Sequence, residues 1–598
     1  MEINHELDNI PSMGEVSKAI KQMSSGKAPG SDAIPAEVYK AGGPVMLQKL
    51  TQLFQSIWNE GKVPQQFKDA TIVHIYKRKG NRQSCDNHRG ISLLSIAGKI
   101  LARVLLNRLT EHLEQDPPLL PESQCGFRAS RGTADMIFAA RQLQEKCQEQ
   151  NSELYTTFVD LTKAFDTVSR DGLWTIMKKF GCPNRFITVV QQFHDGMMAS
   201  VLDDGDTSQA FPVTNGVKQG CVLAPTLFSM MFAAMLTDAF QGYEDGIPLR
   251  YRTDGRVFNP RRLQAITKVK ETVIRDFLFA DDCALNASTE EKMQRELDRF
   301  SSACDNFGLT ISTTKTEVMH QTAPGKPYHE PCITVKGHKL QAVDRFTYLG
   351  STLSREVNID VEVSSRIAKA SAAFGRLRKN VWECRGLSTT TKLKVYRAVV
   401  LTTLLHACET WTVYSRHAKQ LNHFHTSCLR RLLRIKWQDK IPDSEVLRRA
   451  CIPSVYTLLQ KAQLRWAGHL VRMSDSRLPK QLFYGELSSG KRSVGGQKKR
   501  YKDSLKVSVK DFGYCDNTWE TLAKDRSAWR AGITSGAHSA EARRLDEAEK
   551  KRAARKSRAG STSTLGSEHT CPTCGKNCHA RIGLLSHLRT HRPLSTSN

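Results

Sequence analysis

The spacing of apolar and polar positions predicts helices at the start of the chain and a strand after them. Residues 14–59 have apolar residues at helical spacing, interrupted at 24–35, where glycine, proline and serine are frequent. Residues 70–80 predict a strand that runs into a basic turn. Residues 88–109 predict a loop followed by an amphipathic helix. The first part of the chain is therefore expected to mix helices with strands.

Short apolar runs and one long apolar segment follow. The runs at 153–168 and 276–288 are broken by acidic residues, as strands that end at a site would be. Residues 291–307 predict a polar helix, and 346–354 predict a hairpin. The longest apolar run, 222–240, contains a proline and an aspartate and follows a glycine-rich turn, so we expect a buried helix and no membrane span there.

From residue 356 onward the pattern is helical and basic, and tryptophans recur in it at Trp382, Trp411, Trp437 and Trp466. A polar linker is expected at 486–503, a charged helix at 541–558 and a Ser/Thr/Gly linker at 559–568. The sequence has no internal repeat.

The distribution of charge separates the two halves of the chain. Residues 1–360 contain 42 Lys and Arg against 42 Asp and Glu, whereas residues 361–598 contain 46 against 18, so the whole net charge of +28 lies in the second half. A merely soluble surface does not need such a one-sided excess. Nucleic acid is the expected partner of a basic region of this size.

The 16 cysteines lie mostly alone within apolar patterns, as do Cys147, Cys221, Cys283 and Cys408. Scattered thiols of this kind are typical of a reducing compartment and argue against a disulfide framework. The polar, acidic start of the chain shows no signal peptide. We therefore expect an intracellular protein of the nucleus and cytoplasm, without a membrane partner.

Carboxylates embedded in apolar sequence supply the candidate chemistry. Asp281 and Asp282 are adjacent within DFLFADDCALNA, which reads as a hairpin with both at its tip, and Asp160 ends a second apolar strand. Buried ionised carboxylates are costly unless they are paired or bind metal. Three that converge from neighbouring strands would suit Mg²⁺. An isolated Asp pair is more often a solvated turn, so its context decides between these readings.

That context resembles LINE-type (non-LTR) retrotransposon reverse transcriptases. FVDLTKAFDTV, NGVKQGCVLAPTLFSMMF, FADD, GLTISTTKTEVM and YLGSTLS resemble, in order, the palm motifs of that family, and GKAPGSDAIPAE and NHRGISLLSIAGKILARVLLNRL resemble its upstream motifs. The resemblance covers about residues 15–360. It continues more weakly to about residue 510 through RWAGHLVRM and YGELSSGKRSVGGQKKRYKD, which look like the region downstream of the polymerase in RTE-like elements.

The resemblance implies an α+β fold of the right-handed polymerase type, with fingers, an antiparallel palm sheet and a thumb. It implies an RNA-directed DNA polymerase that uses template RNA, a primer or target DNA, dNTPs and two Mg²⁺ ions. Asp160 and Asp281 match the two essential metal ligands and Asp282 supports them, while Leu161 would add its backbone carbonyl. Whether the enzyme forms oligomers stays open.

Further residues match positions that contact the nucleotide in this family. Phe165 stands where an aromatic gate lies under the sugar, and Gln219 and Gly220 stand where a loop packs beneath the incoming nucleotide. Lys77 and Arg89 match the positions that hold the triphosphate, although either could be a solvated surface charge. Phe165 could instead be a core residue.

Lys315 matches the lysine proposed to protonate pyrophosphate in this family. Two local departures from the family pattern occur. Ser312 replaces a common asparagine three residues before Lys315, and Arg89–Gly90–Ile91–Ser92 replaces a common RPIS.

A second metal site is predicted near the C-terminus. Cys571 and Cys574 are separated by two residues, and His587 and His591 by three, with 12 residues between the pairs. This spacing is typical of tetrahedral Zn²⁺ in a ββα finger, which a segment of this size needs in order to fold. A single finger reads at most about three base pairs, so it is expected to add affinity for RNA or DNA.

These observations divide the chain into five predicted domains. Residues 1–55 form an N-terminal extension with the first motif, 56–355 the fingers and palm, 356–485 a helical basic thumb or connector, 486–568 a basic linker with a charged helix, and 569–594 the zinc finger. No endonuclease precedes the polymerase motifs, which suggests a truncated element copy. The alternative function is a domesticated, non-catalytic nucleic-acid-binding protein that keeps the polymerase scaffold.

Overall fold

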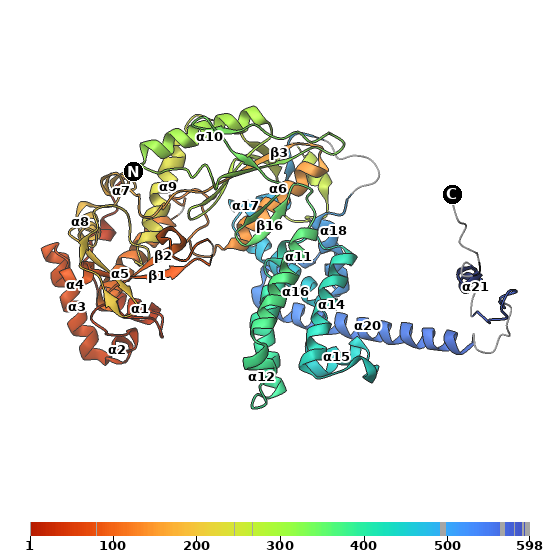
Figure 1. Ribbon diagram of the computed structural model, residues 1–598. Coiled ribbons are helices and arrows are strands. Elements are labelled where there is room, and N and C mark those ends of the chain that lie inside the picture. Colours follow the sequence, from red (N-terminus) through yellow and green to blue (C-terminus); the bar gives the residue numbers. More distant parts are fainter. Residues whose placement is uncertain are drawn as a thin grey trace, which may run out of the picture.

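The computed structural model describes residues 2–591, except for 79, 116, 244, 266, 491–497, 562–568, 579–580 and 589–590. Figure 1 shows an N-terminal region of helices and sheets, a helical region packed beside it, and the long helix α20, which leads toward a small C-terminal module. The content is therefore mixed helix and sheet, as the sequence pattern predicted.

The N-terminal region is built from helices and a small sheet. A capping box at Ser12 and Glu15 starts the first helix, because each side chain accepts from the other residue's backbone N–H. The helices are α1 (Met13–Gln22), α2 (Ala36–Ala41), α3 (Gly43–Glu60), α4 (Gln65–Lys68), α5 (Ile96–Leu113), α7 (Arg170–Lys179) and α8 (Asn184–Gln192). The sheet joins β1 (Ala70–Tyr76), β2 (His88–Leu93), β4 (Met198–Asp203), β5 (Asp206–Thr207) and β6 (Phe211–Pro212).

A second, central sheet carries the predicted acidic strands. Its order is β14-β11-β3-β10-β9, and every neighbouring pair is antiparallel except β11 with β14. The strands are β3 (Leu154–Val159), β9 (Asp276–Phe279), β10 (Asp282–Ala287), β11 (Glu317–Gln321) and β14 (Gln341–Ala342). Two short hairpins adjoin it, β12 (Thr334–Val335) with β13 (His338–Lys339) and β15 (Arg345–Tyr348) with β16 (Ser351–Ser354). The hairpin predicted at 346–354 is thus confirmed.

Helices cover both faces of the central sheet. In β3, Tyr155 and Val159 join the core with α9 (Ala224–Phe240) and α10 (Glu290–Asn306). Leu154 and Phe158 instead join a second core with α6 (Thr133–Glu149). Because successive side chains of a strand point to opposite faces, β3 is buried on both of them. The apolar run 222–240 is a buried helix, as predicted, and no helix among the described residues is long and apolar enough to cross a membrane.

The second half of the chain is helical, as its pattern predicted. Its helices are α11 (Asp360–Arg376), α12 (Thr389–Val395), α13 (Thr402–Leu404), α14 (Ser415–Leu432), α15 (Asp443–Ala450), α16 (Val455–Arg472), α17 (Leu478–Tyr484), α18 (Tyr501–Asp511), α19 (Trp519–Lys524), α20 (Arg526–Ser561) and α21 (Arg581–Leu588). The short helical turns η6 (Cys408–Thr410) and η7 (Trp437–Asp439) lie between them. The charged helix expected at 541–558 is part of α20.

The prediction of a linker at 486–503 is wrong at both ends. Strand β17 (Glu486–Leu487) pairs with β7 (Ile247–Tyr251), which also pairs with β8 (Lys270–Ile274). Helix α18 already begins at Tyr501, whose side chain is fully buried with Trp519 and Trp529. The middle of the predicted linker, 491–497, and most of the one at 559–568 lie outside the described residues. The described residues at 486–490 and 498–540 are therefore largely folded structure.

Polar side chains of α6 account for this error. Lys146 donates to the carbonyl of Gly485 at 2.6 Å, and Arg500 lies 3.1 Å from Glu149. Glu486 forms ion pairs with Lys146 at 3.5 Å and with Lys502 at 2.8 Å. Charged residues indicate a solvated segment only when they lack buried partners, and these have them.

Candidate active site

The register of two strands brings the three predicted aspartates together. β10 pairs with β3 so that Cys283 lies opposite Val159. Asp282 directly precedes Cys283 and Asp160 directly follows Val159, so both lie at this end of the ladder, and the charge of Asp160 acts on Asp282. β9 and β10 pair Phe279 with Asp282, which leaves Ala280 and Asp281 as a two-residue turn. Ala280 has a left-handed φ of 61°, as such tight turns require. The predicted hairpin tip is therefore confirmed, with Asp281 in its turn and Asp282 at the first residue of β10.

The electrostatics of this corner favour a cation. Burial raises the pKa of Asp281, and burial with repulsion from Asp281 and Asp160 raises the pKa of Asp282 to about 6. The Arg89 guanidinium opposes the shift at Asp281. Lys315 lies 3.4 Å from Asp160, with both side chains about half exposed or more. Hard carboxylate oxygens that are costly to ionise together fit a divalent cation such as Mg²⁺.

A neighbouring loop, which the sequence reasoning missed, holds the aspartate turn. The fully buried side chain of Gln124 accepts from the Ala280 N–H at 3.1 Å and donates to the Ala280 carbonyl at 3.3 Å. The Cys125 N–H donates to the carbonyl of Leu278 at 2.9 Å. A Cβ on Gly126 would lie 2.1 Å from the backbone nitrogen of Ala280. Only a glycine fits there without moving backbone, so this loop sets the position of Asp281.

Arg128 anchors the same loop. Its guanidinium pairs with Glu114 at 2.6 Å and also donates to the carbonyls of Pro121 and Gln124. In the sequence this loop is QCGFR, residues 124–128. Its one glycine indicates a turn, but hydrophobic periodicity does not distinguish the segment from an ordinary loop.

The structure also joins the predicted nucleotide-contact segments. The carbonyl of Phe165 accepts from the N–H of Val217 at 2.8 Å, and the carbonyl of Gln219 accepts from the N–H of Ser92 at 2.9 Å. Gly220 has φ 109°, and a Cβ there would lie 2.6 Å from the Ser92 carbonyl oxygen. The segments after β3, before α9 and at the end of β2 thus meet through their backbones.

The side chain of Phe165 is half-buried and stacks on Phe228 with ring centroids 4.5 Å apart. Leu161 is buried, and its backbone bridges to Ile311 beside Asp160. These positions are compatible both with a core role and with a role at the site.

Of the two predicted triphosphate contacts, Arg89 lies close enough to Asp281 to affect its pKa. Arg89 is exposed in β2, and its charge opposes the rise that burial causes in the pKa of Asp281. The Lys77 ammonium instead donates to the carbonyl of Asp86 at 2.9 Å, within the turn that joins β1 to β2.

Comparisons with known proteins agree with this geometry. The family model described as "Reverse transcriptase (RNA-dependent DNA polymerase)" matches residues 75–353, which include all three aspartates. The chain contains a reverse transcriptase domain. The matched residues run from the end of β1 to β16, and the resemblance to LINE-type reverse transcriptases is confirmed.

Relatives of the reverse transcriptase domain come from mobile elements. The RNA-directed DNA polymerase from mobile element jockey of Drosophila melanogaster is 24% identical over 438 residues, covering 72% of this chain and 45% of that protein. A putative uncharacterized transposon-derived protein of Caenorhabditis elegans is 29% identical over 267 residues, covering 43% of this chain and 93% of that protein. The chain spans less than half the length of the jockey polymerase. Among solved structures, apo telomerase from Candida tropicalis matches with TM-score 0.31 and 14% identity, covering 54% of this chain and 59% of that one.

The predicted zinc ligands also converge. One ligand atom from each of Cys571, Cys574, His587 and His591 lies within 4.8 Å of the others. A backbone bridge between Thr570 and Asn577 positions the two cysteines, and α21 carries His587. Two sulfur and two imidazole donors at this separation fit tetrahedral Zn²⁺.

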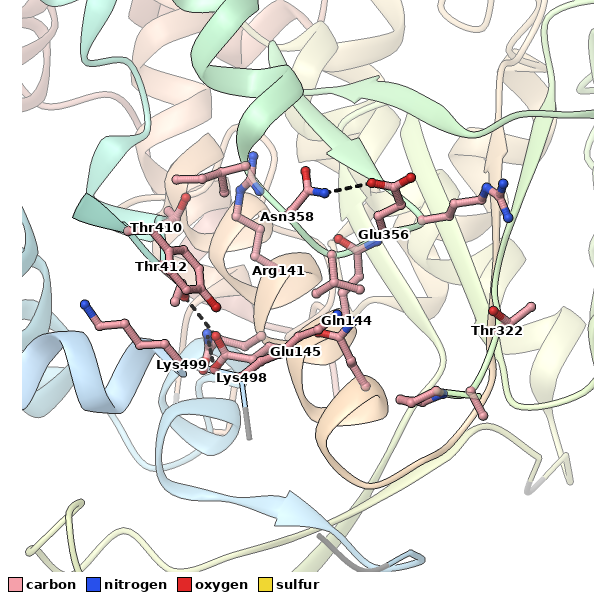
Figure 2. Close-up of a pocket in the computed structure, with 18 of the residues that line it drawn as sticks. Arg141, Gln144, Glu145, Thr322, Glu356, Asn358, Thr410, Thr412, Lys498 and Lys499 are labelled. Atoms are coloured by element: carbon pink, nitrogen blue, oxygen red, sulfur yellow. Dashed lines mark hydrogen bonds between the residues drawn. The ribbon is translucent and has the colours of Figure 1, made fainter. Parts of the chain in front are cut away.

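A cavity of about 550 Å³ lies elsewhere, between α6, the loop before α11 and residues 498–499 (Figure 2). Glu145 is half-buried at its wall, where it accepts from the Thr412 hydroxyl at 2.8 Å and the Tyr501 N–H at 2.9 Å. Burial raises the pKa of Glu145 to about 7. None of the three aspartates lines this cavity, so it is separate from the candidate active site.

Proposed function

We propose that this chain is an RNA-directed DNA polymerase of the LINE (non-LTR) type, which extends a primer 3′-hydroxyl with dNTPs on an RNA template. The observation that supports this most strongly is the convergence of Asp160, Asp281 and Asp282 within a reverse transcriptase domain. A protein that only binds nucleic acid gains nothing from three carboxylates that raise one another's cost of ionisation.

In this proposal Asp160 and Asp281 hold two Mg²⁺ ions, with Asp282 and the carbonyl of Leu161 in support. Bound there, the ions would activate the primer hydroxyl and stabilise the leaving pyrophosphate. The protein would hold the carboxylates in position. The Gln124 side chain contributes to this through two hydrogen bonds to the Ala280 backbone in the turn. Lys315, whose ammonium lies 3.4 Å from Asp160, would give a proton to the pyrophosphate.

The neighbouring residues would select and hold the nucleotide. Arg89 would contact the triphosphate, because its charge already acts on Asp281. Phe165 would lie under the sugar and exclude a ribose 2′-hydroxyl, and Gln219 and Gly220 would support the base pair. The contact of the Lys77 ammonium with the Asp86 carbonyl makes Lys77 a weaker candidate than Arg89.

We further propose that the central sheet is the palm, the N-terminal helices and the β1–β2 hairpin are the fingers, and the helices from α11 are the thumb and connector. Residues 569–594 would form a ββα zinc finger that adds affinity for RNA or DNA. The protein would act inside the cell, in the nucleus and cytoplasm. The basic second half, which holds the whole net charge of +28, would bind the nucleic acid.

The second candidate is a non-catalytic nucleic-acid-binding protein, which the basic second half and the zinc-ligand cluster favour. Primer extension on an RNA template with the full chain separates the two. Asp160→Asn and Asp281→Asn should each abolish dNTP incorporation while RNA affinity stays within about twofold. Asp238→Asn, an exposed aspartate near the end of α9, is the matched control and should extend normally. Full extension by either active-site variant would refute the proposed polymerase site.

A further inference from the structure

One tryptophan differs from all the others in its exposure. Six of the eight are buried, namely Trp58, Trp174, Trp411, Trp466, Trp519 and Trp529. Trp382 is half-buried and stacks on Phe374 with ring centroids 5.0 Å apart. Trp437 is 84% exposed. A Trp side chain usually buries a large apolar area, either in the core or against a ligand. The exposed indole of Trp437 is therefore a candidate binding residue.

The turn that carries Trp437 is held by both flanks, so the indole is presented outward by the fold. We call residues 434–441 the Trp437 turn. Ile435 and Ile441 pack against the core of the helical region on either side. Within the turn, the Asp439 carboxylate accepts from the Lys436 N–H at 2.7 Å, and Lys440 adopts a left-handed φ of 49°.

Helix α20 supports the same corner. The Arg552 guanidinium donates to the carbonyl of Lys440 at 3.2 Å, and Arg448 of α15 pairs with Glu549 of α20 at 2.8 Å. Figure 1 shows α20 passing beside α15 on its way to the C-terminal module. The Trp437 turn is thus fixed to two helices.

Four cations within six residues of Trp437 in the chain have no acidic partner among the described residues. Arg431, Arg434, Lys436 and Lys440 are all exposed, and no carboxylate of the described residues lies within 4 Å of their charged groups. Nearby Arg430, Arg448 and Arg449 are paired, with Asp443, Glu445 or Glu549. The segment that carries Trp437 therefore has an excess of uncompensated positive charge.

We infer that the Trp437 turn is a stacking site for an unpaired base of RNA, with Arg431, Arg434, Lys436 and Lys440 contacting the flanking phosphates. The flat indole face offers stacking to any base, and each base stacked on an aromatic side chain contributes about 1–3 kcal/mol. A protein partner would favour apolar neighbours around the tryptophan, and here the neighbours are cations. Within an RNA duplex the bases stack on one another, so they offer the indole no free face. The inference extends the proposed function in that the RNA would be the polymerase template.

The test is equilibrium binding of the full chain to a fluorescent single-stranded RNA and to a blunt RNA duplex of the same length, by anisotropy at several salt concentrations. All proteins carry Asp281→Asn, so the result does not depend on polymerisation. Trp437→Ala should weaken single-strand binding by about 5- to 100-fold. Trp437→Phe should retain most of the affinity, and Gln438→Ala, in the same turn, should bind as the parent does.

Three further readouts distinguish stacking from other roles. Duplex binding by Trp437→Ala should change less than twofold, and its salt slope should match the parent, because the cations remain. Lys436→Ala should lower the single-strand salt slope by about 0.7. Unchanged single-strand affinity in Trp437→Ala, or an equal loss on both RNAs, would overturn the inference. A change in molecular mass in solution on Trp437→Ala would also overturn it, by assigning the turn to contact between protein chains.

Discussion

Gly126→Ala should displace the aspartate turn without removing a functional group. The new Cβ would lie 2.1 Å from the backbone nitrogen of Ala280, 2.8 Å from its Cα and 2.9 Å from the carbonyl carbon of Phe279. All three are backbone atoms next to Asp281, so no side chain can move aside. Restoring ordinary contact requires an opening of about 1 Å or more between the loop and the turn.

The expected loss follows from that displacement. A shift of about 1 Å at reacting groups costs about 100-fold in rate, whereas overpacking costs about 1–3 kcal/mol of stability. We therefore expect the rate constant for dNTP incorporation to fall by about 100-fold in a protein that remains folded at 25 °C. Affinity for RNA should change little, because the basic second half is untouched.

The assay is single-turnover primer extension on RNA, with RNA affinity and the thermal unfolding midpoint measured on the same preparations. Gly132→Ala is the matched control, since the nearest atom to its new Cβ is 4.0 Å away. A Gly126→Ala enzyme that incorporates dNTPs within twofold of wild type would refute the idea that this loop sets the position of Asp281.

Three other predictions address separate parts of the chain. Phe165→Ala should raise rNTP use relative to dNTP use by about tenfold or more in competition assays, and an unchanged ratio would leave Phe165 as a core residue stacked on Phe228. Burial raises the pKa of Glu145 from 4.5 to about 7, so the folded state keeps a proton that the unfolded state releases, and the contribution of Glu145 to stability should fall by roughly 3 kcal/mol from pH 4.5 to pH 8. In urea titrations the stability of Glu145→Gln relative to wild type should therefore rise by about this amount over the same pH range, and parallel pH profiles for the two proteins would contradict the assignment. Glu486→Gln should instead destabilise the protein above pH 4.5, because Lys146 and Lys502 lower the pKa of Glu486. Cys574→Ser should abolish Zn²⁺ binding by the C-terminal module while primer extension on a simple template continues, and loss of extension would tie the module to the polymerase.

The contacts of α6 also decide how the binding regions can be tested. Measuring RNA affinity on separate fragments, 1–360 and 361–598, would compare the neutral half of the chain with the basic half. A cut at residue 360 would, however, remove Gly485, Arg500 and Tyr501 from their partners on α6 and leave buried charges unpaired. Tests on the full chain avoid this loss of stability.

Much of the site was predictable from local sequence. Apolar runs that end in aspartates predicted the strand before Asp160 and the hairpin tip with Asp281 and Asp282, and both are present. The zinc ligands were predictable for a similar reason, because their spacing within one short segment limits where their donor atoms can lie. A pattern that spans only a few residues predicts local structure well, since few distant contacts can override it.

Tertiary structure decided the rest. Gln124 and Gly126 lie in an unremarkable loop, and their role comes from contact with Ala280, more than 150 residues away. Glu486 and Lys502 read as linker residues, yet they are ion-paired partners against α6.

The tryptophans give the same contrast. Trp411, Trp437 and Trp466 occur in similar basic, helical sequence, and only the packed structure leaves Trp437 exposed and buries the other two. The sequence by itself determined the local elements and the residue types that suit metal ions and phosphates. Which polar groups are buried and which aromatic ring meets solvent depend on partners far along the chain, because burial is a property of the whole packed molecule.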